Sequence, residues 1–356
     1  MKIVLGIESS CDETAIALVR EDRVVLAQAL ATQQSEHAPY GGVVPEIAAR
    51  AHLTQIDRLY RQALEEAKLD ISQVDAVAVT TGPGLIGGVI VGLMLGKALA
   101  AAASKPFISV NHLEGHALTV RLTDGVAFPY FLLLISGGHC QQLVVRGVGD
   151  YVRLGGTKDD ALGEAFDKCA KMLGLPYPGG PALERVARDG NPKAYAFPRP
   201  LTGSEGCDFS FSGLKTAVRL TIEKEVARVG SLTPEIIANV AASFEAAVLD
   251  VLDERVARGL AMAKEHHAIT ALAVAGGVAA NQAIGARLRS LATAHGLPLV
   301  VAPPALCTDN AAMIAWAGME RLMLGATDDL TVEPRARWPL TELTPVTALA
   351  VGSQTA

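Results

Sequence analysis

Aromatic residues are scarce in this chain of 356 residues, at 4% of the total, and charged residues make up only 19%. Hydrophobic residues nevertheless reach 50%, so the core must be built mainly from Ala, Val, Leu and Ile, packed closely with 34 glycines. This composition excludes a disordered chain. The length suffices for two ordinary domains or for one large protein with two lobes.

An excess of positive charge is also missing, since the formal net charge is −6 and the pI is near 5.8. That balance excludes a protein that coats nucleic acid by bulk electrostatics, although it is compatible with a local basic stripe. No Cys-x-x-Cys pair occurs among the five cysteines. This favours free thiols in a reducing compartment over a disulfide framework.

Long uninterrupted hydrophobic runs are absent as well. The N-terminal apolar stretch reaches a carboxylate at Glu8, too early for a secretory signal. The longest apolar run, Leu85 to Ala103, contains several glycines and Lys97 and follows an expected strand. It therefore predicts a buried helix rather than a membrane span. We expect a cytoplasmic protein without a membrane segment.

A strand, polar turn and strand pattern occurs twice along the chain. The two strand pairs are residues 2–7 with 14–19 and residues 130–135 with 141–145. Each pair is followed by a further strand, a glycine turn and a helix, beginning near Ala76 and Ala271. The repeat predicts an α/β protein with two related lobes; two unrelated α/β domains are the alternative.

Helices are expected between these strands. One begins near Pro45 and repeats apolar residues at Leu53, Ile56, Tyr60 and Leu64. A longer one follows the capping residue Thr233. Shorter ones are expected over residues 160–173 and 181–190, and residues 191–213 predict a long functional loop.

His112 and His116 form the sharpest local signal. On a helix this i, i+4 spacing puts both imidazoles on one face, where they can share a divalent metal; one packed and one solvent-facing histidine is the alternative. A zinc peptidase would need Glu at the second position of the motif, where Leu113 stands. Asp309 precedes an apolar helix and is a candidate third ligand, or only a helix cap.

Two glycine turns, Ser136–Gly138 and Gly276–Asn281, would let backbone amides approach an anion. Neither matches a Walker A or Gly-x-Gly-x-x-Gly loop, so an ordinary tight turn is the alternative for each. The turn Tyr177–Pro181 before Glu184 would suit ribose hydroxyls, or it is only structural. Residues 193–219 combine aromatics, hydroxyls and cations, a pattern that suits an RNA backbone and a stacked base.

A further stripe of acidic and basic residues is expected on the helix over 160–173. Asp160, Glu164, Asp167 and Lys168 recur at helical spacing, which is typical of a solvated face with ion pairs.

Eight stretches in this order resemble the tRNA threonylcarbamoyladenosine transferase family of the TsaD type, once described as glycoproteases. The stretches are Gly6–Thr14, His112–His116, Ser136–His139, Gly163–Lys168, Tyr177–Pro181, Phe209–Thr216, Gly276–Asn281 and Cys307–Ala311. The resemblance covers roughly residues 2–320. Cys140 departs from it, because a threonine is common at that place.

The resemblance implies the fold of the sugar kinase, Hsp70 and actin (ASKHA) superfamily, with two ribonuclease-H-like lobes and an interlobe cleft. The first lobe would comprise residues 1–128 plus about 310–342 and carry the metal histidines. The second would comprise residues 129–309 and carry the nucleotide site. Residues 343–356 would form a flexible tail.

The resemblance also implies the site residues. His112, His116 and Asp309 would bind one divalent metal per subunit, Fe²⁺ first and Zn²⁺ as the alternative. The phosphate or acyl part of threonylcarbamoyl-AMP would lie on Leu134, Ile135, Ser136, Gly137 and Gly138. Its ribose and adenine would lie on Asp167, Gly180, Glu184 and Asn281. Asp12 and Glu13 are the first candidates for a catalytic base.

The implied reaction moves the threonylcarbamoyl group from threonylcarbamoyl-AMP to N6 of adenine 37 in tRNAs that read codons beginning with A, forming t6A. The implied partners are tRNA, an inactive TsaB-like paralogue and a small TsaE-like P-loop ATPase, and the helix near Pro45 offers an apolar face for such a contact. A sugar or acetate kinase, which needs no paired histidines, and a metal-bound structural subunit or protease are the rival classes.

Overall fold

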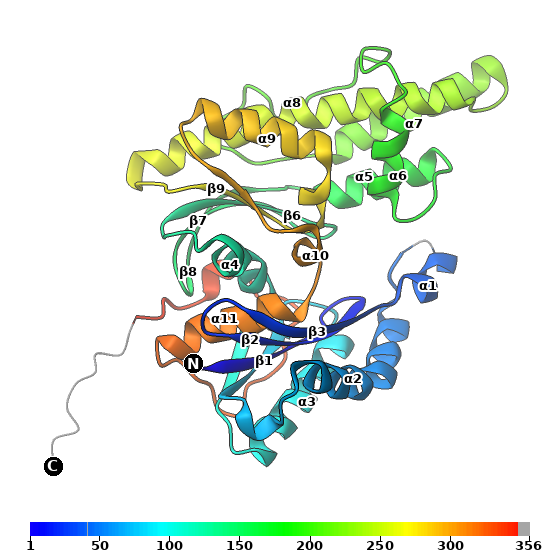
Figure 1. Cartoon of the computed structure of the whole chain (residues 1–356). Helices are drawn as coiled ribbons and strands as arrows, with labels where there is room; N and C mark the ends of the chain where they lie inside the picture. Colours follow the sequence, from blue (N-terminus) through cyan, green and yellow to red (C-terminus); the bar gives the residue numbers. More distant parts are fainter. Residues whose placement is uncertain (41, 348–356) are drawn as a thin grey trace. The chain divides into compact units, whose positions relative to one another are not determined.

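The computed structural model describes residues 1–40 and 42–347, and these fall into two compact units. Among the described residues, unit 1 comprises 1–40, 42–125, 146–151 and 308–347; unit 2 comprises 126–145 and 152–307. Each unit is built around a five-stranded mixed sheet with helices packed on it (Figure 1).

The sheet of unit 1 has the order β3-β2-β1-β4-β5. Its strands are β1 (Ile3–Glu8), β2 (Glu13–Arg20), β3 (Val25–Thr32), β4 (Ala76–Gly82) and β5 (Phe107–Asn111). The central strand β1 pairs antiparallel with β2 and parallel with β4. The helices of this unit are α1 (Gln34–His37), α2 (Pro45–Ala67), α3 (Ile86–Ala102), α4 (His112–Asp124) and α11 (Ala311–Met323).

Small residues let the helices of unit 1 approach the sheet closely. Neighbouring residues of a strand face opposite sides, so Gly6 of β1 faces α11 while Ile7 faces α3. A Cβ atom at Gly6 would lie 2.4 Å from the carbonyl oxygen of Ala311. A Cβ atom at Gly96 of α3 would lie 2.1 Å from Val79. Glycines at these positions therefore allow close helix–sheet packing in a core that is poor in aromatic residues.

The sheet of unit 2 repeats this arrangement with the order β10-β9-β6-β7-β8. Its strands are β6 (Tyr130–Ile135), β7 (Cys140–Gly147), β8 (Asp150–Gly156), β9 (Leu272–Ala275) and β10 (Leu299–Val301). The central β6 pairs antiparallel with β7 and parallel with β9, as β1 does with β2 and β4. The common order confirms the predicted repeat.

Six helices accompany the second sheet in the described part of the chain. They are α5 (Leu162–Met172), α6 (Gly179–Ala187), α7 (Ser212–Val229), α8 (Pro234–His266), α9 (Gln282–Ala294) and α10 (Pro304–Cys307). The predicted cap of α8 is confirmed, because the Thr233 hydroxyl accepts a hydrogen bond from the Ile236 amide at 3.3 Å. Residues 188–211 contain neither helix nor strand, as the predicted loop requires.

The apolar pattern predicted for α2 is wrong at Leu53, which is 65% exposed. The buried residue there is the polar His52, one position earlier; the stripe continues with Ile56, as predicted, and with Leu59 in place of Tyr60. Likewise α3 is not buried all round, since Met94 stands 58% exposed. None of the helices in the described part of the chain combines the length and the hydropathy that a bilayer crossing requires.

The observed unit limits differ from the predicted ones in three places. Residues 146–151 and 308–309 fall in unit 1, whereas the prediction put them in the second lobe, and residues 126–128 fall in unit 2 instead of the first lobe. The difference at 146–151 is explained by Glu114 of α4, whose carboxylate accepts hydrogen bonds from the Gly149 amide at 2.8 Å and the Tyr151 hydroxyl at 3.0 Å.

The predicted flexible tail is described only up to residue 347. Within that part, the Val346 amide donates to the carbonyl oxygen of Val148 at 2.9 Å, so the chain is held against the turn at 146–151. Residues 348–356 of the predicted tail lie outside the described residues.

The first turn of α7 is capped by a carboxylate from elsewhere in the chain, since the preceding Phe211 has no side-chain oxygen. Asp159 accepts from the amides of Phe211 at 2.7 Å and Ser212 at 3.2 Å, and from the Ser210 hydroxyl at 2.5 Å. Burial alone would raise the pKa of Asp159, but these hydrogen bonds outweigh it and hold the pKa below 3.8, its ordinary value.

We predict that Asp159→Asn lowers the free energy of unfolding by about 1 kcal/mol near neutral pH, the usual effect of losing a helix cap. Because the pKa of Asp159 is lowered by folding, its contribution is complete above the ordinary value and is lost as the pH falls through the folded value. Urea denaturation at several pH values checks this. The exposed Asp57→Asn serves as control, and a loss that persists unchanged in acid would contradict the assignment.

Candidate metal centre

The two histidines lie within the first two turns of α4, on a helix as predicted, and the start of that helix is fixed on both sides. Asn111 caps it by accepting from the Leu113 amide at 2.9 Å, and its own amide group donates to the Trp338 carbonyl oxygen at 2.8 Å. The rings of His112 and His116 lie edge to face with centroids 4.8 Å apart. Both therefore face the same side of the helix.

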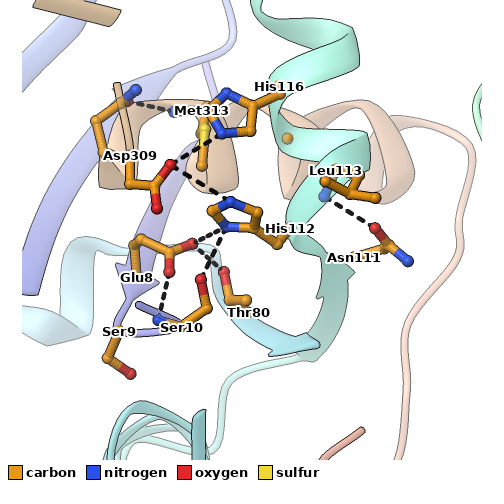
Figure 2. A network of polar contacts seen from close by, with 12 residues as sticks. Glu8, Ser9, Ser10, Thr80, Asn111, His112, Leu113, His116, Asp309 and Met313 are labelled. Atoms are coloured by element: carbon orange, nitrogen blue, oxygen red, sulfur yellow. Dashed lines mark hydrogen bonds and ion pairs between the residues drawn. The ribbon is translucent and has the colours of Figure 1, made fainter. Parts of the chain in front are cut away.

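Asp309 completes this group. Its Oδ1 atom lies 3.0 Å from Nε2 of His116 and 3.4 Å from Nε2 of His112 (Figure 2). The alternative that Asp309 only caps α11 is wrong, because Asn310 does so by accepting from the Met313 amide at 3.0 Å.

The three side chains fit a metal ion. One ligand atom from each lies within 4.8 Å of the others, in a site that buries both histidines. Two imidazole nitrogens and one carboxylate oxygen form a donor set that binds Fe²⁺ or Zn²⁺ in many proteins. His116 Nδ1 is buried and accepts or donates no hydrogen bond among the described residues, so its ring is oriented by its Nε2 side.

Glu8 is the residue of this site that the sequence did not reveal. It ends β1, is fully buried, and its Oε2 atom lies 2.9 Å from Nδ1 of His112. The Thr80 hydroxyl donates to the same oxygen at 2.5 Å, and the Ser10 amide donates to Oε1 at 2.6 Å (Figure 2). A carboxylate on one ring nitrogen directs the other nitrogen towards a metal position. The sequence feature that could have pointed to Glu8 is a carboxylate at the end of an expected apolar strand.

The charges of this group depend on one another. Burial alone would lower the pKa of His112, but Asp309 and Glu8 raise it well above 6.5. Burial likewise opposes ionisation of Asp309, yet His112 holds the pKa of Asp309 well below its ordinary value. An imidazolium between two carboxylates offsets one of their two negative charges, and a divalent cation bound to neutral imidazoles would offset both.

Of the two candidate catalytic carboxylates, Glu13 is the one whose surroundings are best defined. It begins β2, and burial raises the pKa of Glu13 to about 9, with repulsion from Asp309 and Asp12 adding to the rise. The charge of Asp309, a candidate metal ligand, therefore affects the protonation of Glu13. Asp12 hydrogen-bonds to Glu13 and offers its backbone carbonyl oxygen to the Gln33 amide at 3.1 Å.

The predicted substrate residues all lie in unit 2, where the two glycine turns are neighbours. Leu134 and Ile135 end β6, and the carbonyl oxygen of Ser136 accepts from the Gly163 amide of α5 at 3.2 Å. Gly276 has a φ of 92°, and a Cβ atom there would lie 2.4 Å from the Ile135 carbonyl oxygen. Cβ atoms at Gly137 and Gly138, in contrast, would contact nothing within 4 Å.

The remaining four substrate residues join the ends of three helices. Asp167 of α5 accepts from the amides of Gly179 at 2.8 Å and Gly180 at 3.2 Å, and burial raises the pKa of Asp167. Glu184 of α6 accepts from the Gln282 amide at 3.0 Å. Asn281 caps α9 by accepting from the Ile284 amide at 2.8 Å. Asp167 thus joins α5 to α6, and Glu184 joins α6 to the start of α9, where Asn281 lies.

The predicted strip for RNA at residues 193–219 is wrong for base stacking by Phe209 and Phe211. Both are fully buried in the core of unit 2, so neither ring can stack on a base. Three of the four cations of this strip are paired with carboxylates: Arg199 with Asp250 at 2.9 Å, Lys215 with Asp160 at 2.5 Å, and Arg219 with Glu223 at 2.5 Å. Contact of the strip with an RNA backbone stays a prediction. The stripe on α5 contributes the ion pair of Lys168 with Asp160 at 2.9 Å, as expected.

Comparison with known proteins supplies the family. The family model for "TsaD: tRNA N6-adenosine threonylcarbamoyltransferase" matches residues 24–316. A tRNA N6-adenosine threonylcarbamoyltransferase of Brucella anthropi is 59% identical over 346 residues, which is 95% of each chain. The tRNA N6-adenosine threonylcarbamoyltransferase of Brucella canis is 60% identical over 346 residues, again 95% of each chain.

Solved structures show the fold. Full-length HypF in its phosphate- and nucleotide-bound form has a TM-score of 0.59 at 13% identity, covering 91% of this chain and 47% of that one. HypF of T. kodakarensis has a TM-score of 0.58 at 15% identity, covering 90% of this chain and 48% of that one. With the two mixed sheets, this likeness confirms the predicted α/β fold class.

We predict that Glu8→Gln weakens divalent metal binding by about 10–100-fold, because the negative charge that orients His112 is lost. Competition of Zn²⁺ and of Fe²⁺ with a chromogenic chelator measures the affinity, and thermal unfolding shows whether the variant is folded. Glu46→Gln, at an exposed ion pair with Arg50, is the matched control. Unchanged affinity in a folded Glu8 variant would rule out this role.

Proposed function

The chain belongs to the tRNA N6-adenosine threonylcarbamoyltransferase family, acyltransferases that form t6A in tRNA, and from this premise we propose its donor, its metal and its partners. The donor is threonylcarbamoyl-AMP and the acceptor is N6 of adenine 37 in tRNAs that read codons beginning with A. N6 attacks the carbamoyl carbonyl carbon, a C–N bond forms, the bond to the phosphate oxygen breaks, and AMP leaves as N6 gives up a proton.

His112, His116 and Asp309 are proposed to hold one divalent metal ion. The convergence of two Nε2 atoms on one carboxylate oxygen is the observation that carries this proposal. A set of two histidines and one carboxylate is typical of non-haem Fe²⁺ sites, so iron is proposed first and Zn²⁺ second. When bound, the ion supplies a Lewis acid and a template for oxygen ligands.

Backbone amides of unit 2 are proposed to bind the donor. The open turn with Gly137 and Gly138 can place N–H groups against the phosphate or acyl oxygens, which offsets the charge that develops there. Leu134, Ile135 and Ser136 set the direction of that turn. The group of Asp167, Gly180, Glu184 and Asn281 is proposed for the ribose and adenine, because its carboxylates and amides match their hydroxyls and ring nitrogens.

Asp12 and Glu13 are proposed as catalytic carboxylates. An exocyclic amine is a weak nucleophile, so orientation contributes more than deprotonation. With a pKa near 9, Glu13 holds its proton at neutral pH in the absence of a cation and is suited to donating a hydrogen bond. Asp12 is then the first choice for receiving the proton of N6.

A TsaB-like paralogue is proposed to dock on the outer faces of α2 and α3, which pack against each other. Leu53 of α2 and the row Ile86, Ile90 and Met94 of α3 are between 42% and 65% exposed, and the row repeats every four residues. Apolar stripes of this kind usually mark an interface. We further propose a cytoplasmic location and help from a TsaE-like P-loop ATPase, since a chain of net charge −6 needs partners to hold tRNA.

The reaction is tested by incubating the protein and its partners with threonylcarbamoyl-AMP and unmodified tRNA, followed by nucleoside mass spectrometry. We expect modified adenosine from the native protein, and at least a 100-fold loss together with loss of bound metal from His112→Ala/His116→Ala. His266→Ala, at an exposed site on α8, is the control. Full activity and metal content in the double variant would refute the metal proposal, and ATP hydrolysis on a small metabolite without product would favour a kinase.

The partner surface is tested by Ile90→Asp. A buried carboxylate at an apolar interface is strongly unfavourable, so we expect binding of the paralogue to weaken by more than about 10-fold. Leu220→Asp, at an exposed apolar site on α7 of unit 2, should leave binding unchanged. Isothermal titration with the purified paralogue measures both. If both variants bind the paralogue equally well, the interface does not include Ile90.

A further inference from the structure

The turn between β1 and β2 is held at three successive carbonyl oxygens. That of Ser10 accepts from the Leu85 amide at 2.7 Å, that of Cys11 from Nε2 of His52 at 3.1 Å, and that of Asp12 from the Gln33 amide at 3.1 Å. The donors come from the start of α3, from α2 and from the residue before α1. Of the three donors, His52 is the one that acts through a side chain.

His52 belongs to a buried chain of polar side chains. Its Nδ1 atom lies 2.7 Å from the Thr14 hydroxyl and 3.3 Å from Nε2 of Gln33. Oε1 of Gln33 lies 3.1 Å from Nε2 of His37, whose Nδ1 accepts from the Val44 amide at 3.3 Å. All four side chains are fully buried in unit 1.

These contacts allow one consistent arrangement of protons. Because the Cys11 carbonyl oxygen can only accept, His52 carries its proton on Nε2, and the lone pair of Nδ1 accepts mainly from Thr14, with the longer Gln33 contact as a weaker second donor. Because the Val44 amide can only donate, His37 also carries its proton on Nε2 and donates to Gln33. Burial lowers the pKa of His52, which agrees with a neutral ring.

The ring of His52 is also confined sterically. A Cβ atom at Gly88 of α3 would lie 2.9 Å from Nε2 of His52 and 2.4 Å from the Ser9 carbonyl oxygen. The Ser9 hydroxyl donates to the Gly88 carbonyl oxygen at 2.9 Å and accepts from the Gly92 amide at 3.1 Å. The helix α3 therefore packs against both the His52 ring and the turn, with no room for a side chain at Gly88.

We infer that His52 is a positioning residue for the transferase reaction. Its Nε2–H group fixes the Cys11 carbonyl and thereby the direction in which Asp12 and Glu13 leave the turn, while Gln33 and Thr14 fix the tautomer of its ring. If position 52 had only to fill space, an apolar side chain would suffice, because a buried polar group costs free energy unless it is fully hydrogen-bonded. The inference rests on the proposed catalytic role of Asp12 and Glu13.

The test compares His52→Leu with His52→Gln. Leucine fills the space without donating, so kcat should fall by roughly 10–100-fold while KM for tRNA and the content of bound metal stay unchanged, the result expected when reacting groups are misplaced. Glutamine can donate to Cys11 and accept from Thr14, and it should restore most of kcat. His266→Leu on α8, exposed to solvent, is the matched control.

Asp12→Asn and Glu13→Gln are assayed alongside. If they lose activity while a folded His52→Leu keeps its kcat, the positioning role is overturned and the proposed function stands. If both retain full activity, their catalytic role fails and the inference fails with it. Should His52→Leu not fold, Thr14→Val replaces it, since it removes one donor to Nδ1 and should lower kcat in the same way.

A spectroscopic measurement needs no variant of His52 to fold. Nuclear magnetic resonance of protein labelled with ¹⁵N-histidine should show the rings of His37 and His52 neutral and protonated on Nε2. The His37 signals are identified by their loss in His37→Gln, and the His52 signals by their shift in Thr14→Val, which removes a donor to Nδ1. A charged ring or an Nδ1–H tautomer at His52 would contradict the inference, because such a ring could not accept from Thr14 while donating to Cys11.

Discussion

The buried pairing of His112 with Glu8 on one ring nitrogen and Asp309 on the other is the interaction on which unit 1 depends. Charges are expensive to bury unless each has a partner, so the ends of β1, α4 and α11 must meet within hydrogen-bonding distance. Small residues permit this approach. A Cβ atom at Gly115 would lie 2.8 Å from Ile314, and one at Gly6 would lie 2.4 Å from the backbone of Ala311.

The turn after β1 is therefore held from two sides. Glu8 accepts the Ser10 amide on the side of the metal residues, and His52 donates to the Cys11 carbonyl oxygen on the side of α2. A turn with so many fixed hydrogen bonds presents Asp12 and Glu13 in one arrangement; with the catalytic role proposed for them, this saves the entropy of ordering them during the reaction.

Unit 2 repeats the strand order without the charged cluster. After β6 the chain passes through Gly137 and Gly138, which are exposed and where a Cβ atom would contact nothing within 4 Å. Charged side chains elsewhere in unit 2 are paired with one another, as in Arg199 with Asp250 and Lys215 with Asp160. The repeat thus carries a closed charged cluster in one unit and an open polar turn in the other.

Features that arise within a few residues were determined by the sequence itself: the spacing of His112 and His116 on one helical turn, the cap at Thr233, and the repeated hairpins. Features that join distant parts of the chain were decided by the tertiary structure. Glu8 and His112 are separated by 104 positions, so no periodicity links them. Whether Asp309 or Asn310 caps α11, and whether His52 or Leu53 is buried, depends on which neighbour supplies hydrogen bonds or apolar contact, and those neighbours are assembled only by folding.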